Sequence, residues 1–160
     1  MKALLLGSFI LGGLLATTPV AMSQTAPPDT EQARKVETLV NEAAALVEKN
    51  GKAAFAEFKK KDSKWFHGDI YIFSYDMNAT VLLNAAFPER EGRNMTGQKD
   101  VKGKPFHDEI IHIAQTKGSG WIDLMMLRPG RTEPVLKWAF VRRVTIDSTP
   151  GVIGSGFYPD

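Results

Sequence analysis

Hydrophobic residues recur three and four positions apart over residues 30–49, which is the spacing of one apolar face on an α-helix. Thr30 can cap the start of this predicted helix, because its hydroxyl can accept a hydrogen bond from the first helical turn. The Asn50-Gly51 pair is typical of a helix that ends in the left-handed conformation. A second, short helix is predicted over residues 52–60.

From residue 69 the pattern changes to β-branched and aromatic residues with the two-residue alternation of strands. A third helix is predicted over 106–117, after Pro105. The predicted strands fall on both sides of that helix, at 70–75, 80–83, 121–127, 136–145 and 152–158. Strands that cluster while helices stay segregated favour an α+β domain, with one five-stranded antiparallel sheet and the long helix packed against it.

A polar segment with three glycines, residues 88–103, separates the second predicted strand from the third helix. Loops of this length without regular structure are commonly functional. A sheet covered by a long helix on one face and by a loop and a short helix on the other can leave a concave site under the loop, where small molecules tend to bind.

The N-terminus has the composition of a secretory signal peptide, with Lys2 followed by an apolar run. We predict a signal peptide over 1–23, a linker over 24–29 and one domain over 30–160. An uncleaved membrane anchor is the alternative, but a spanning helix needs about 20 apolar residues and Gly12-Gly13 interrupts this run. The expected product is a periplasmic or secreted bacterial protein that does not insert into the membrane after cleavage.

The composition excludes several classes of function. The 160 residues include no cysteine, which excludes disulfides, thiolate catalysis and covalent haem attachment. The net charge of +2 is too small for a nucleic-acid partner. His107 and His112 are five positions apart and so point to different sides of a helix, which argues against a metal site. Without a nucleophile elbow or a phosphate loop, we expect no enzyme activity and no cofactor.

Several short motifs occur in a fixed order that is similar to a known family. They are NGKAAF at 50–55, YIFSYD at 71–76, GRN at 92–94, KDVKGK at 99–104, KGSGWID at 117–123, Lys137 and GSGFY at 154–158. In these motifs residues 31–160 resemble a single Cache domain of the second type, the extracellular sensor module of chemoreceptors and histidine kinases.

The resemblance implies a PAS-like fold, with a long N-terminal helix behind a central antiparallel sheet and a ligand pocket between the sheet and the loops. Members of the family bind small organic molecules, often carboxylates. Receptor members continue from the last strand into a membrane helix, whereas this sequence ends at Asp160. It is therefore similar to stand-alone secreted members, whose signalling partner would be a separate membrane sensor kinase or chemoreceptor.

Several positions depart from the family pattern. Asn84 stands where a histidine is usual, and Ala79 stands where the turn has a glycine. Leu124 and Met126 stand where tyrosine and tryptophan are common. These exchanges replace an aromatic wall and a titratable donor by softer, more apolar groups, which implies a more apolar ligand or a pocket that holds none.

The candidate ligand-binding residues lie on the strands and the loop that border the expected pocket. Arg93, Lys99 and Lys137 would supply positive charge, Asn84 and Asp100 would orient polar groups, and Tyr71, Phe73, Trp121 and Met126 would form walls. Each has an ordinary alternative. Asp100 can cap a turn, Arg93 can be solvated, Lys137 can extend along the sheet edge to water, and the aromatic side chains can pack in the core.

Two hypotheses follow for the function. The first is a small-molecule-binding sensor that feeds a separate signalling partner. The second is a non-catalytic structural or interaction protein that keeps the same scaffold with a collapsed pocket.

Overall fold

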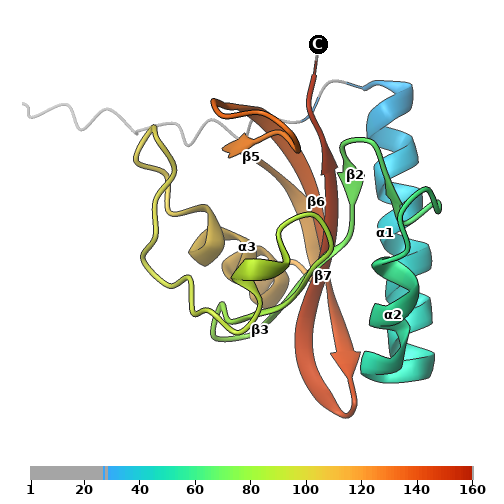
Figure 1. Cartoon of the computed structure of the whole chain (residues 1–160). Helices are drawn as coiled ribbons and strands as arrows, with labels where there is room; N and C mark the ends of the chain where they lie inside the picture. The colour runs from blue at the N-terminus through green and yellow to red at the C-terminus, as the bar shows by residue number, and fades with distance from the viewer. Residues whose placement is uncertain (1–26, 28, 160) are drawn as a thin grey trace, which may run out of the picture.

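The computed structural model describes residues 27 and 29–159; the predicted signal peptide and most of the predicted linker lie outside these residues. The described chain forms layers around one antiparallel sheet. Helix α1 (Glu31–Asn50) covers one face, and helix α3 (Phe106–Thr116) lies on the other (Figure 1). The α+β class, the long helix and the single five-stranded sheet are as the sequence predicts.

The long helix begins and ends where its sequence signals predict. Thr30 Oγ1 accepts a hydrogen bond of 3.1 Å from Ala33 N at the first turn. Gly51 follows the last helical residue with φ of 57°, a left-handed conformation that glycine adopts without a steric penalty. The predicted short helix over 52–60 is instead a 3-10 turn η1 (Gly51–Ala54) followed by one α-helical turn α2 (Phe55–Phe58), because the chain bends to bury Phe58 beside α1.

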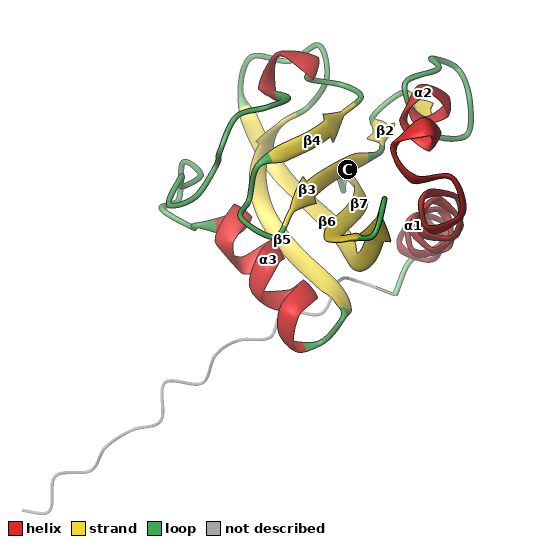
Figure 2. Cartoon of the chain, turned by 90° about the horizontal axis from the view of Figure 1, so that it is seen from below, coloured by secondary structure: helices red, strands yellow, loops and turns green. Residues whose placement is uncertain are grey.

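The sheet has the strand order β4-β3-β7-β6-β5, antiparallel throughout (Figure 2). Its strands are β3 (Phe73–Asp76), β4 (Val81–Asn84), β5 (Ser119–Leu127), β6 (Pro134–Ile146) and β7 (Thr149–Phe157). The predicted strand over 70–75 is divided: Ile70 and Tyr71 form β2, which pairs with β1 (Phe66–His67) in a separate hairpin, and only the second half joins the main sheet.

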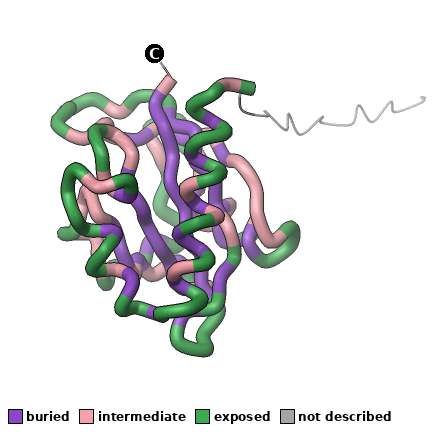
Figure 3. The backbone as a smooth tube through the Cα atoms, turned by 90° about the vertical axis from the view of Figure 1, so that its right-hand side faces the viewer, coloured by how far each residue is buried: buried purple, intermediate pink, exposed green. Residues whose placement is uncertain are grey.

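Alternation along the strands sends side chains into two hydrophobic clusters. On β6, Trp138 and Phe140 pack toward α1, while Ala139 and Val141 pack toward α3. In Figure 3 much of the sheet is buried, whereas many residues of α1 and of the outer loops are exposed. The cluster on the α3 side also contains the aromatic residues of β3, and the candidate site lies there.

The turn between β3 and β4 explains the glycine preference that the resemblance implies for position 79. Ala79 has φ of 61° and is buried, so a residue with a side chain occupies a left-handed position. Asp76 Oδ1 holds this turn by accepting hydrogen bonds from Asn78 N at 2.9 Å and Thr80 N at 2.8 Å.

Within the described part of the chain, none of the helices is long and apolar enough to cross a membrane.

Candidate functional site

A small internal cavity lies between the α3 side of the sheet and the first turns of α3. Its volume is about 20 Å³, which is room for one water molecule but not for an organic ligand in this state. The residues around it come from β2, β3, β4, α3, β5 and β6: Tyr71, Phe73, Tyr75, Asn84, Phe106, Ile110, Leu124, Met126, Lys137 and Ala139.

Lys137 brings a positive charge into this apolar surrounding. The residue is 2% exposed. Its Nζ lies 3.9 Å from the ring centre of Tyr71, 5.8 Å from that of Phe73 and 5.2 Å from that of Tyr158. The negative faces of aromatic rings attract a cation, but they do not replace the hydration that the ammonium group loses. Burial therefore lowers the pKa of Lys137 to about 7.

Lys137 has no carboxylate partner within the part of the chain that the structure describes. The positive charge of Arg90 further lowers the pKa of Lys137, and Asp69 opposes this effect. Asp69, however, is paired with Arg128. Among the described residues no ion pair includes Lys137. A buried cation is usually paired, so this cavity has the electrostatics of a site for a small anion.

Two glycines of β7 make the space that these side chains occupy. A Cβ at Gly156 would lie 2.7 Å from Lys137 Cε and 2.3 Å from the carbonyl oxygen of Trp138. A Cβ at Gly154 would lie 2.5 Å from Phe73 Cζ. The Gly-Ser-Gly sequence on β7 is therefore the local reason that Lys137 and Phe73 can lie against the sheet.

A larger cleft of about 290 Å³ opens next to the cavity, under residues 88–103. Met126 and Phe106 line both spaces, so their side chains separate the cleft from the cavity. Arg90, Arg93 and Lys99 give the cleft its positive charge. The guanidinium group of Arg90 also contacts Met126, with 3.6 Å between Nη1 and Sδ.

Asp100 lines the cleft, but its carboxylate holds the loop in place. Oδ1 accepts hydrogen bonds from Lys102 N at 2.8 Å and Lys104 N at 3.0 Å, and Oδ2 accepts one from Met125 N at 2.9 Å. These three backbone donors favour the charged form, and the pKa of Asp100 is lowered although partial burial opposes this. The geometry supports the capping alternative for Asp100 and fixes the loop to strand β5.

His107 is a buried polar residue at the inner end of the cleft. It is 2% exposed, and its Nδ1 has no hydrogen-bond partner among the described residues. Its ring centre lies 3.9 Å from that of Phe106 and 5.4 Å from that of Tyr75. Burial, assisted by the charge of Arg90, lowers the pKa of His107 to about 4, so the imidazole is neutral near pH 7.

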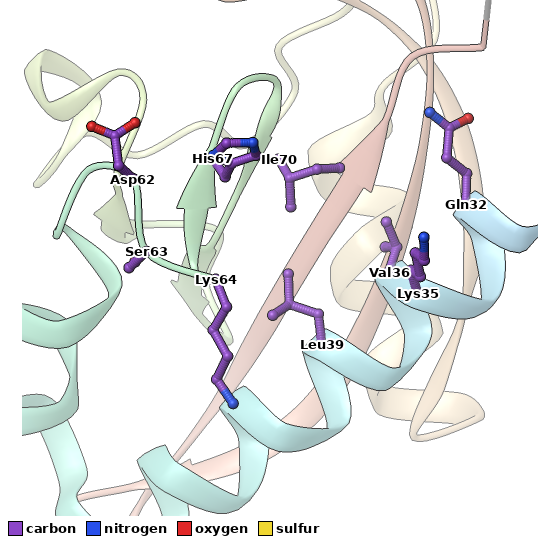
Figure 4. A pocket seen from close by; sticks show the side chains of 9 residues that line it. All are labelled: Gln32, Lys35, Val36, Leu39, Asp62, Ser63, Lys64, His67 and Ile70. Atoms are coloured by element: carbon purple, nitrogen blue, oxygen red, sulfur yellow. The ribbon is translucent and has the colours of Figure 1, made fainter.

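A separate open pocket of about 420 Å³ lies between α1 and the β1–β2 hairpin. Figure 4 shows Leu39 and Ile70 extending toward each other across its floor. The two lysines at its rim are exposed and already paired, Lys35 with Glu31 and Lys64 with Glu42. This pocket therefore offers mainly apolar surface with exposed charges at its rim, and it holds no buried charged side chain like Lys137 among the described residues that line it.

The structure divides the sequence-predicted site residues into those that line the cavity, those that line the cleft, and Trp121, which lines neither. Tyr71, Phe73, Asn84, Met126 and Lys137 line the cavity, and Arg93, Lys99, Asp100 and again Met126 line the cleft.

Asn84 is already engaged, because its Oδ1 accepts a hydrogen bond of 2.9 Å from Phe87 N. Trp121 lines neither space: it packs on the α1 side of the sheet, 5.2 Å from the ring centre of Phe140 and 6.1 Å from that of Phe157. Since its side chain lies on the opposite face of the sheet from the cavity, we leave Trp121 out of the proposed site.

Among the polar residues of the site that sequence reasoning misses are Arg90 and His107, which both line the cleft. Arg90 lies in the polar segment 88–103, which the sequence marks as functional, so its charge is a usable signal. The spacing of the histidines bears only on metal binding and says nothing of a ligand at His107. His107 directly follows Pro105 and Phe106, at the start of a helix that packs on the sheet. This position is the signal that His107 is buried near the loop.

Comparisons with known proteins decide the family. The family model described as a Cache domain matches residues 60–160, more than half of the chain. The chain belongs to the Cache domain family. This confirms the family resemblance seen in the sequence, and Cache domains are sensor domains that bind ligands.

A curated relative is the methyl-accepting chemotaxis protein McpP of Pseudomonas putida, 24% identical over 92 residues. The match covers 58% of this chain but only 16% of that receptor. Among solved structures, a periplasmic sensor domain of a chemotaxis protein has a TM-score of 0.71 and 27% identity, covering 81% of this chain and 95% of that one.

A second structure, described as the basis for carboxylic acid recognition by a Cache chemosensory domain, has a TM-score of 0.69 and 22% identity, over 80% and 93% of the two chains. At this identity the likeness shows the fold alone.

Proposed function

We propose that this Cache domain senses a small carboxylate, which binds in the cavity beside Lys137 after entering through the cleft under residues 88–103. The observation that carries the proposal is the buried ammonium group of Lys137, which has aromatic neighbours and a nearby second cation, Arg90, but no carboxylate partner among the described residues. A ligand carboxylate would supply the missing negative charge. One structural neighbour is a Cache chemosensory domain described as recognising carboxylic acids, which supports this choice of ligand.

Binding requires the cavity to expand, because about 20 Å³ is less than even a two-carbon acid occupies. Met126 is the side chain best suited to move, since methionine is unbranched and adapts to irregular spaces. Met126 separates the cavity from the cleft, and Nη1 of Arg90 lies 3.6 Å from its Sδ. A carboxylate that draws Arg90 inward would release this contact and join the two spaces.

The family and the predicted signal peptide support a place outside the inner membrane, in the periplasm or secreted. In this proposal the ligand-loaded domain is recognised by a separate membrane receptor or sensor kinase. The loop 88–103 is the element that would transmit the change, because it carries Arg90 and is fixed to β5 through Asp100.

Titration calorimetry with acetate, propionate and butyrate tests the proposal. We expect the chain to bind at least one of these acids. Lys137→Met should weaken binding at least thirtyfold, because removing one partner of a buried charge pair costs about 2–5 kcal/mol. Lys117→Met, at an exposed lysine after α3, is the matched control and should bind like the parent chain.

The collapsed cavity favours one alternative, an interaction protein that keeps the Cache scaffold without a ligand. The same titration separates the two functions. No heat and no thermal stabilisation by any of the three acids, even at millimolar concentration, would contradict the sensor function and favour the alternative.

A further inference from the structure

The cleft is lined by one buried polar side chain, His107, that does not contact the carboxylate in the site proposed above. His107 lies in the first turn of α3 and is 2% exposed, yet its Nδ1 has no hydrogen-bond partner among the described residues. A buried polar atom without a partner costs about 1–3 kcal/mol, so such atoms usually meet a water molecule or a ligand. His107 lines the cleft, and its neighbour Phe106 borders both the cleft and the cavity.

The state of His107 restricts what can bind to it. The imidazole is neutral near pH 7, because burial lowers its pKa to about 4. A neutral imidazole has one donor nitrogen and one acceptor nitrogen. It therefore suits a hydroxyl group, which donates and accepts, better than a second carboxylate, which only accepts. The positive charge for an anion lies instead with Lys137, in the cavity beyond Met126, and with Arg90, which lines the cleft and contacts Met126.

We propose that His107 determines ligand specificity by hydrogen-bonding the hydroxyl group of a short hydroxycarboxylate whose carboxylate lies toward Lys137 and Arg90. This inference rests on the carboxylate site proposed above and extends it into the cleft. The joined cavity and cleft then form one elongated site, with Lys137 at its inner end and the neutral side chain of His107 in the cleft available to a polar group of the ligand.

The test compares butyrate with 3-hydroxybutyrate and 4-hydroxybutyrate, which differ only by the hydroxyl group and its position. At least one hydroxylated acid should bind about three- to tenfold more tightly than butyrate, as one added hydrogen bond predicts. In His107→Phe this preference should disappear, so that butyrate and the hydroxylated acids bind with similar affinity. His107→Gln keeps a neutral polar side chain and should retain part of the preference.

His112→Phe is the matched control, because this exposed histidine lies on the same helix and should leave the preference unchanged. Thermal unfolding of each variant shows that it is folded before titration. Equal affinity of the parent chain for butyrate and both hydroxy acids would overturn the inference while leaving the carboxylate site intact, and so would a preference that survives in both His107 variants. Failure of all three acids to bind while acetate or propionate binds would overturn the inference alone, and failure of acetate and propionate as well would overturn the carboxylate site and the inference together.

Discussion

Replacing Lys137 by methionine should make the protein more stable, by an amount that depends on pH. Methionine keeps the length and the apolar stem of lysine but removes the buried charge. The pKa of Lys137 falls from 10.5 to about 7 on folding. This difference corresponds to about 5 kcal/mol of destabilisation when the group is charged in both the folded and unfolded states.

The sign follows from proton binding. Below about pH 7 the lysine is charged in both states and the full cost is present. Between about pH 7 and 10.5 the unfolded chain binds the proton more strongly than the folded chain, so the parent protein gains stability as the pH rises. The free-energy advantage of Lys137→Met should therefore shrink by about 3 kcal/mol between pH 6 and pH 9.5.

Urea unfolding at pH 6, 8 and 9.5 measures this difference, with Lys117→Met as the control for removal of an exposed charge. Taking the difference between variant and parent cancels the other titrating groups. A difference that is constant with pH within about 1 kcal/mol would show that Lys137 does not carry its charge in a buried site. A variant less stable than the parent at pH 6 would refute the reasoning in the same way.

Three further substitutions test the scaffold around the site. Asp100→Ala should lower the unfolding free energy by about 2–4 kcal/mol in urea titrations at pH 7, because three backbone donors lose their acceptor. The pKa of Asp100 is lowered in the folded state, so this loss should diminish as the pH falls below about 4. Gly156→Ala should cost about 1–3 kcal/mol and weaken carboxylate binding in calorimetry, since the new methyl group displaces Lys137. Ala79→Gly should raise the melting temperature through a gain of about 1 kcal/mol, because φ of 61° strains alanine; an unchanged or lower melting temperature would contradict the strain.

The elements of this fold were predictable because their patterns are local. The three- and four-residue spacing in α1 and the alternation in β6 depend only on the geometry of a helix and a strand. The division of the strand predicted at 70–75 could not be predicted from such a pattern. It arises because Ile70 and Tyr71 pair with β1, and this pairing depends on how the preceding segment folds back.

The site was predictable in outline but not in detail. Lys137 stood out as a charge among apolar neighbours, and the segment 88–103 stood out by its length and polarity. The face on which Trp121 lies was not fixed by alternation alone, because alternation does not say which of two buried faces holds the pocket. The size of the cavity depends on the packing of Met126 and Phe106, which no sequence pattern specifies.

The titration of Lys137 itself, followed by NMR of the chain labelled with carbon-13 in its lysine side chains, tests the central claim most directly. Lys137→Met identifies the signal by its loss. We predict a midpoint near pH 7 in the free protein and a midpoint raised by at least one pH unit when a bound carboxylate pairs with the ammonium group, as an opposite charge within contact distance requires. A midpoint that stays the same in the presence of every one of these acids, namely acetate, propionate, butyrate and both hydroxybutyrates, would contradict the account.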